Sequence, residues 1–177
     1  MELDPVDRIT VGAVGEPGER TFFLQARRGT DLVTIVVEKQ QVQLLAATVV
    51  DMLSRLGADV ATEFDEAEME LEQPLVPEWR AGRLAVGYEE DRDLFMLEAE
   101  EAEDEDDDDD DEEQDEEGEL GGEVRFWATR DQMLALARHG IAVAAAGRPT
   151  CEFCGNPMDP EGHICPAMNG HGRLGDA

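Results

Sequence analysis

The chain has 177 residues, of which 41% are hydrophobic, and its formal net charge is −30. This length suits one compact domain with an appendage, and the apolar content can support a core. No run of about 18 apolar residues occurs and the N-terminus is acidic, so we expect neither a transmembrane helix nor a signal peptide and predict a cytoplasmic protein. The negative charge disfavours nucleic-acid binding, because phosphate backbones would be repelled.

The first third of the chain contains three short runs that favour strands, of which the first alternates apolar and polar residues and the second has β-branched and aromatic residues. We predict strands over residues 8–14, 21–27 and 32–38, and their short connections favour an antiparallel meander. The apolar period then lengthens from two to 3.6 residues, which predicts a helix over residues 39–56 that ends at Gly57. Its inward stripe consists of Val42, Leu45, Ala46, Val49, Leu53 and Leu56.

The middle of the chain begins with a polar connection over residues 58–81 that is predicted to be partly helical between residues 63 and 71. Alternation then returns in three runs, which predicts strands over residues 83–88, 94–98 and 123–128. The three predicted strands of the first third are therefore followed by three more.

A second helix is predicted over residues 130–146, because Thr129 and Gln132 have the spacing of a capping box. Its expected inward residues are Met133, Leu134, Ala137, Ile141 and Ala145. Three strands and a helix thus occur twice. This order predicts an α+β fold in which an antiparallel sheet, made of two three-stranded halves, carries two helices packed on one face.

An acidic tract separates the last two predicted strands. Fifteen of the seventeen residues from Glu101 to Glu117 are Asp or Glu. Such a segment cannot bury enough apolar surface to fold, so we predict a disordered insert over about residues 101–121. We interpret it as a solubilising insert; a mimic of nucleic-acid charge, a shield over nearby arginines and a weak buffer of divalent cations are the alternatives.

All three cysteines lie near the C-terminus in the pattern C-x2-C-x8-H-x-C, formed by Cys151, Cys154, His163 and Cys165. Three thiolates and one imidazole are a ligand set typical of tetrahedral Zn²⁺. Four protein ligands leave no open position for water, which favours a structural zinc over a catalytic one. His171 is the alternative fourth ligand.

Two other interpretations of the cysteines stay open at this point. They could be incidental, or Cys151 and Cys154 could form a redox pair. Redox motifs of this spacing usually open a helix after a strand, whereas this one follows a predicted helix, so the zinc site is favoured. An odd number of cysteines also suits a reducing compartment better than a disulfide framework.

Arginines gather near the first two predicted strands at Arg20, Arg27 and Arg28. They could bind an anionic small molecule or partner. They could equally neutralise neighbouring acidic residues, which is the commoner arrangement at a protein surface. The rest of the chain shows no recognisable catalytic constellation.

Five motifs at the two ends of the chain belong together. They run from Gly12 to Arg27, from Glu38 to Gln41, from Ala146 to Pro149, from Cys151 to Gly155 and from Asp159 to Gly170. These motifs resemble those of an uncharacterised actinobacterial family, the domain of unknown function 3090. The resemblance covers nearly the whole chain except the acidic tract, and it implies a cytoplasmic setting and a zinc-ribbon-like C-terminus but no assigned activity.

We therefore predict an α+β domain over residues 1–148 and a zinc-knuckle tail over residues 149–177. The leading functional hypothesis is a non-catalytic, zinc-stabilised adaptor that binds another cytoplasmic protein. The first alternative is an enzyme or binder for an anionic small molecule that uses the three arginines. A weaker alternative is nucleic-acid binding through the zinc tail.

Overall fold

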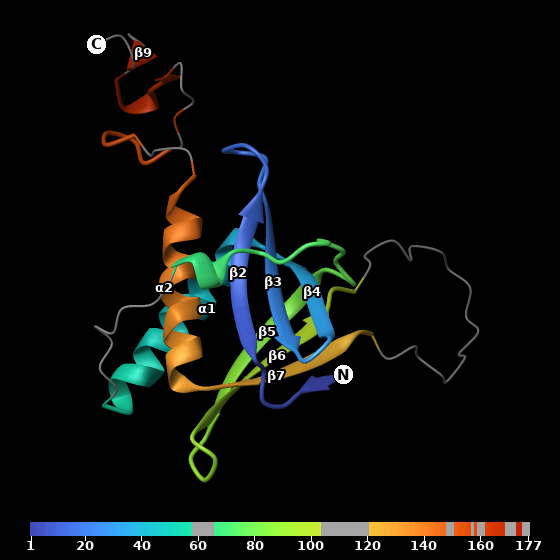
Figure 1. The fold of residues 1–177 in the computed structure, drawn as a ribbon. Helices are drawn as coiled ribbons and strands as arrows, with labels where there is room; N and C mark the ends of the chain where they lie inside the picture. The colour runs from blue at the N-terminus through green and yellow to red at the C-terminus, as the bar shows by residue number, and fades with distance from the viewer. Residues whose placement is uncertain are drawn as a thin grey trace, which may run out of the picture.

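A computed structural model describes residues 1–57, 66–103, 121–147, 151–156, 158, 162–168 and 173–174 of the chain. Within these residues, two larger β-sheets and two α-helices form around one apolar core (Figure 1). The predicted α+β class is confirmed.

The first sheet is the antiparallel meander expected from the N-terminal third. Its strands, in spatial order, are β2 (Arg8–Val14), β3 (Thr21–Arg28) and β4 (Asp31–Val37). Every second side chain enters the core, as the burial of Phe22, Leu24 and Ala26 on β3 shows. The opposite face of this sheet, called here the outer face, carries the intervening residues.

The second sheet has four strands. In spatial order they are β1 (Glu2–Leu3), β7 (Glu123–Ala128), β6 (Leu94–Glu101) and β5 (Ala81–Glu89). β5, β6 and β7 are antiparallel neighbours, whereas β1 runs parallel to β7. β1 was not predicted, because two residues are too few to show a period. The two predicted halves are thus separate sheets, of three and four strands.

Main-chain hydrogen bonds join the two sheets at both edges. Near β4, the N–H of Val36 donates to the carbonyl of Trp79 at 2.9 Å, just before β5 begins. Near β1, the N–H of Val6 donates to the carbonyl of Trp127 and the N–H of Asp7 to that of Arg27, both at 2.8 Å. The sheets therefore curve around a shared core, to which both contribute buried residues.

The helices α1 (Lys39–Arg55) and α2 (Arg130–Ala145) pack against each other on one side of the sheets (Figure 1). α2 also contacts β2, and α1 contacts β5. The capping box predicted at Thr129 is present. In the described part of the chain, no helix combines the length and apolarity needed to cross a membrane.

One prediction for the inward face of α2 is wrong. Ile141 is 51% exposed and Ala145 is also exposed, while Gly140 and Ala144 are buried. The physical reason is a close approach at Gly140, where an added Cβ would lie 3.3 Å from a methyl carbon of Val11. The inward stripe therefore passes through residue 140, and residue 141 is turned about 100° away from it.

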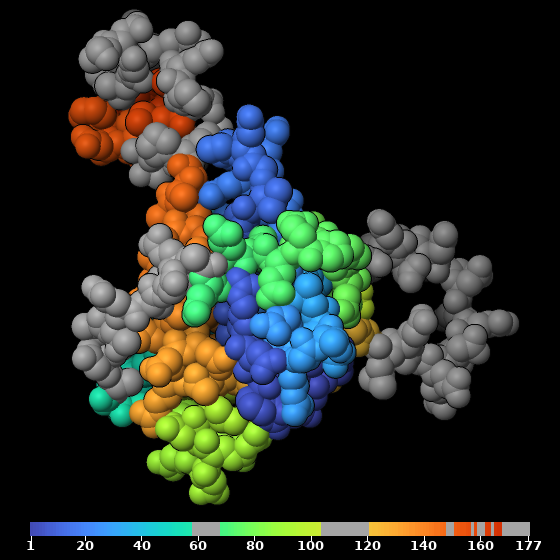
Figure 2. All heavy atoms as spheres, viewed as in Figure 1, coloured from blue at the N-terminus to red at the C-terminus, as the bar shows by residue number. Residues whose placement is uncertain are grey.

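The connection between α1 and β5 crosses the outer face of the first sheet. It includes one 3-10 turn, η1 (Glu66–Met69), where the sequence predicted partial helix between residues 63 and 71. Residues 58–65 lie outside the described residues. Residues 66–73, called here the strap, lie over β2 and β3 in the space-filling view (Figure 2).

The predicted acidic insert joins β6 to β7, and residues 104–120 within it lie outside the described residues. At its base, the N–H of Glu101 donates to the carbonyl of Gly122 at 2.7 Å. The N–H of Gly122 in turn donates to the carboxylate of Glu101 at 2.7 Å. β6 and β7 therefore remain paired up to the point where the insert begins.

Candidate metal centre

The segment that follows α2 lies beyond the C-terminal end of that helix (Figure 1). Within this segment the three cysteines and His163 come together. Cys151 is 2% exposed and Cys165 is fully buried, yet neither belongs to the core cluster of the sheets and helices. This segment therefore buries its thiols among one another rather than in the main core.

A tight turn places the first two cysteines. The N–H of Gly155 donates to the carbonyl of Cys151 at 2.8 Å, and the N–H of Cys151 donates to the carbonyl of Asn156 at 2.8 Å. Gly155 has a φ of +73°, which glycine adopts without the strain that a Cβ would add. The turn thus brings Cys151 and Cys154 to one side of the backbone, as a zinc knuckle requires.

A second short hairpin supplies the other two side chains. β8 (His163–Ile164) pairs with β9 (Arg173–Leu174), and Cys165 follows between β8 and the 3-10 turn η2 (Pro166–Met168). Gly162, with a φ of +82°, precedes the histidine and lets the chain turn into the strand.

Four potential ligand atoms converge at this point. One atom from each of Cys151, Cys154, His163 and Cys165 lies within 4.8 Å of all the others. The Sγ atoms of Cys151 and Cys165 are 3.8 Å apart, and Sγ of Cys154 is 3.3 Å from Nε2 of His163. All three cysteines are free thiols. The four residues therefore lie close enough to hold one metal ion.

The electrostatics of the two knuckle thiols differ. Burial raises the pKa of Cys151, but hydrogen bonds from the backbone of Cys154 and Phe153 outweigh it, so the pKa is lowered. A backbone hydrogen bond from Asn156 lowers the pKa of Cys154, but burial and the neighbouring thiols of Cys165 and Cys151 raise it by more. The thiolate form of Cys151 is thus favoured, whereas that of Cys154 is disfavoured. A bound cation would stabilise both thiolates and so remove the cost of ionising Cys154.

The histidine is oriented for ligation through one nitrogen. Its Nε2 faces Cys154, while its Nδ1 is buried and has no hydrogen-bond partner among the described residues. The predicted alternative ligand, His171, lies outside the described residues. The geometry therefore assembles the four-residue set that contains His163.

One aromatic side chain is held outward by the knuckle. Phe153 lies between the first two cysteines and is 62% exposed. Phe153 lies inside the turn that is closed by the main-chain hydrogen bonds of Cys151 with Gly155 and Asn156. Its ring therefore projects from an ordered backbone. Single exposed apolar side chains are common at protein surfaces, but among those of the described residues Phe153 is the one aromatic.

Comparison with known proteins places the chain in a family. The model of a family described as proteins of unknown function (DUF3090) matches residues 1–165. This chain belongs to that family. The matched region includes all four residues of the metal cluster and ends before His171. Neither the curated proteins nor the solved structures yielded a match.

In this DUF3090 protein the three predicted anion-binding arginines do not form one site. Arg20 precedes β3 and lies over the ring of Phe22, whereas Arg27 is at the other end of the strand, on the order of 20 Å away. Arg27 pairs with Glu72 at 3.2 Å and with Asp7 at 3.9 Å. Two of the three arginines are thus separated along the strand, and Arg27 is neutralised by acidic neighbours.

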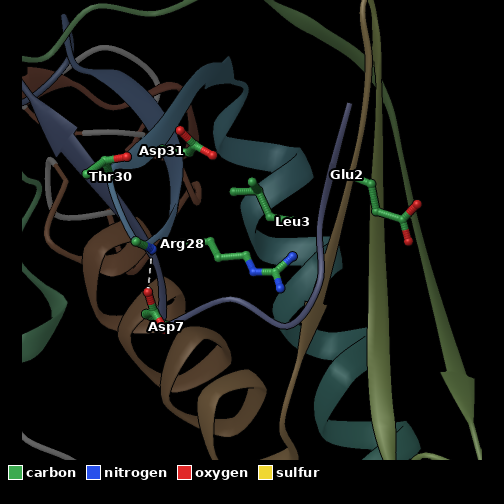
Figure 3. A pocket seen from close by; sticks show the side chains of 7 residues that line it. Glu2, Leu3, Asp7, Arg28, Thr30 and Asp31 are labelled. Carbon is green, nitrogen blue, oxygen red and sulfur yellow. Dashed lines mark hydrogen bonds between the residues drawn. The ribbon is translucent and has the colours of Figure 1, made fainter.

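Arg28 lines an open cavity of about 510 Å³ near the β3–β4 turn. Figure 3 shows its side chain extending towards Leu3, and the N–H of Gly29 donates to Asp7 at 2.6 Å. Three carboxylates share the cavity with this single guanidinium, so its charge does not favour an anionic ligand. The carboxylates are those of Glu2, Asp7 and Asp31.

Proposed function

We propose that Cys151, Cys154, His163 and Cys165 bind one structural Zn²⁺, and that the zinc-bound segment is the protein-binding module of a non-catalytic cytoplasmic adaptor. The donor set supports zinc, because thiolates and imidazole are its usual ligands in structural sites. A reducing compartment suits this site, since it keeps all three thiols available for metal.

The spacing of the ligand atoms carries this proposal. In a tetrahedral site with Zn–S of about 2.3 Å and Zn–N of about 2.0 Å, two sulfurs are about 3.8 Å apart and a sulfur and a nitrogen about 3.5 Å apart. The corresponding separations here are 3.8 Å and 3.3 Å. These are two of the six separations, and all six lie within 4.8 Å, so the ligand atoms would have to close by at most about 1 Å around the ion.

The closed ligand set favours a structural role over a catalytic one. Four protein ligands satisfy tetrahedral zinc, so no coordination position remains for a water or substrate. The cation would neutralise the buried thiolates and so hold residues 151–168 in one conformation. The exposed ring of Phe153 would then be held at a fixed place on the surface, and aromatic side chains are enriched at protein–protein interfaces, which supports a protein-binding module.

Zinc content and stability test the metal site. The full chain, purified without chelator, should contain one zinc per molecule by elemental analysis. His163→Asn should lose the metal, whereas the matched variant His171→Asn should keep it. Chelator should raise amide exchange in residues 151–168 without unfolding the core. A wild-type zinc content near zero, or equal zinc in both histidine variants, would sink the proposal.

A second comparison tests the binding role. Proteins captured from a lysate of the source organism by the zinc-loaded chain should include a partner that Phe153→Asp does not capture. Leu44→Asp is the matched control, because Leu44 is also exposed, at 70%, but lies on α1. Capture that is insensitive to Phe153 and to zinc removal would count against an adaptor that uses the knuckle.

A further inference from the structure

The outer face of the β2-β3-β4 sheet carries ordered rows of polar side chains. In the strand register, Thr10 faces Gln25 and Gln25 faces Thr34, which forms a hydroxyl–amide–hydroxyl row across the sheet. These three residues are at most 2% exposed. A second row pairs Arg8 with Arg27. The same face also carries apolar side chains, so it is polar only in part and needs a cover. These apolar side chains are those of Phe23, Leu32 and Val36.

The strap supplies hydrogen-bond partners for these polar side chains, mainly from its own main chain. The Gln25 amide donates to the carbonyl of Glu72 at 3.1 Å and accepts from the N–H of Glu72 at 2.7 Å. Thr10 donates to the carbonyl of Met69 at 2.5 Å. Arg8 donates to the carbonyls of Glu68, at 2.6 Å, and Glu70. Side chains of the sheet thus form hydrogen bonds with the main chain of the strap, which lies across the sheet.

Two side chains of the strap add selectivity. The carboxylate of Glu72 accepts from Arg8 at 2.8 Å and from Arg27 at 3.2 Å. Leu71 fills the notch above Gly12, where an added Cβ would lie 2.6 Å from its Cγ. The 3-10 turn η1 precedes these two residues, and its carbonyls are also bound. The outer face therefore accepts a turn followed by an apolar residue and then directly by a glutamate.

The chemistry of this contact is that of a peptide-recognition surface. Gln25 bonds to both main-chain groups of Glu72, a contact that does not depend on the side chain of that residue, and the arginine pair selects a carboxylate at the same position. Water or another peptide backbone can replace these hydrogen bonds when the strap leaves, whereas the apolar contact of Leu71 needs an apolar residue in its place. A competing segment of the same pattern needs no rearrangement of the sheet.

From these contacts we infer that the outer face of β2-β3-β4 is a second binding site, which the strap occupies in cis. It takes a segment of a partner protein with the same pattern, a turn followed by an apolar residue and a glutamate. This site is independent of the zinc centre and goes beyond the function proposed for it. The strap competes as a tethered ligand, so it lowers the apparent affinity for the partner segment.

The test uses the full chain and a labelled peptide with the sequence of residues 66–76, titrated by fluorescence anisotropy. Glu72→Ala in the chain weakens the strap by removing its contacts to Arg8 and Arg27. The peptide should bind this variant at least about tenfold more tightly than the wild-type chain, as expected for charge-assisted hydrogen bonds. A peptide with the same glutamate replaced by alanine should lose at least about tenfold.

Two further variants locate the site, both made in the Glu72→Ala chain. Gln25→Ala should abolish peptide binding, whereas Cys151→Ser should leave it unchanged, which separates this site from the zinc centre. Equal affinity for wild-type and Glu72→Ala chains, or binding that survives Gln25→Ala, would overturn the inference. So would binding that is lost with Cys151.

A measurement on the wild-type chain covers the case in which a variant does not fold. Excess peptide should accelerate hydrogen exchange at the amide of Glu72, because its bond to Gln25 is released when the strap is displaced. The amides of α1 should exchange at their original rate. Unchanged exchange at Glu72 at saturating peptide would contradict the inference.

Discussion

Glu72 is the residue through which the strap and the sheet are linked electrostatically. Its partial burial would raise its pKa, but hydrogen bonds from Arg8 and Arg27 and their positive charges lower it by more. The pKa of Glu72 in the folded protein is therefore below its ordinary value. A carboxyl with a lowered folded pKa stabilises the protein when ionised, and this contribution is lost as pH falls through the folded pKa.

Glu72→Gln should therefore reduce the free energy of unfolding at pH 7 by about 1 kcal/mol, a value discounted for the partial exposure of the group. The difference between variant and wild type should be fully present above the ordinary glutamate pKa of about 4.3 and should shrink as pH falls below it. Urea unfolding at pH 7 and pH 3.5 measures both values. Glu70→Gln is the matched control, because Glu70 is exposed; an equal loss in both variants would refute the role of Glu72.

Gly12 sets how closely the strap approaches β2. A Cβ at this position would lie 2.6 Å from Cγ of Leu71, a separation that real structures do not tolerate. Gly12→Ala should push Leu71 off the sheet, destabilise the protein by about 1–2 kcal/mol and raise amide exchange in the strap. Gly87→Ala on β5 is the control, because its Cβ would meet only Met96 at an ordinary 3.5 Å.

An unchanged exchange rate in the strap of Gly12→Ala would show that the notch does not position Leu71. A loss of stability in Gly87→Ala as large as that in Gly12→Ala would show that the effect belongs to glycine replacement in strands generally.

At the scale of elements, period and capping predict most of the fold. Strand patterning, by alternation or by β-branched and aromatic content, located β2, β3 and β4 to within a residue or two, and the pair Thr129 and Gln132 marked the start of α2. The metal cluster was predictable because its ligands lie close together in the sequence, where the spacing that metal ligation requires can be recognised directly. These ligands are Cys151, Cys154, His163 and Cys165.

The strap and its contacts were not predictable in the same way. Thr10, Gln25 and Thr34 occupy the polar positions of alternating strands, so the pattern indicates contact with water, yet all three are buried. Their cover comes from a connection about 40 to 60 residues away in sequence. No local signal shows which distant segment covers a sheet face. The misassignment of Ile141 has a similar cause, because the contact at Gly140 depends on packing between α2 and β2.

The base of the acidic insert leads to a prediction about β6 and β7. Replacing residues 104–120 with a short Gly/Ser linker should leave the fold intact, because the bonds between Glu101 and Gly122 already close the hairpin. Loop closure changes by only about 0.6 kcal/mol per twofold change in length. The melting temperature should therefore shift by no more than about 3 °C, as measured by circular dichroism. A cooperative loss of structure would contradict this account of the insert.

At the scale of the whole molecule, the structure separates an apolar core from two polar contact regions. The core is shared by both sheets and both helices. The metal cluster lies beyond α2 with Phe153 exposed beside it, and the outer sheet face lies beneath the strap. Each of these two regions carries one of the proposed partner-binding sites. The family match spans both regions.

The most direct test of the central claim is zinc K-edge X-ray absorption on the full chain purified without chelator. The account predicts one zinc per chain with three sulfur neighbours at about 2.3 Å and one nitrogen at about 2.0 Å. A chain that contains no zinc, or a zinc whose neighbours are mainly water or carboxylate oxygens, would contradict it.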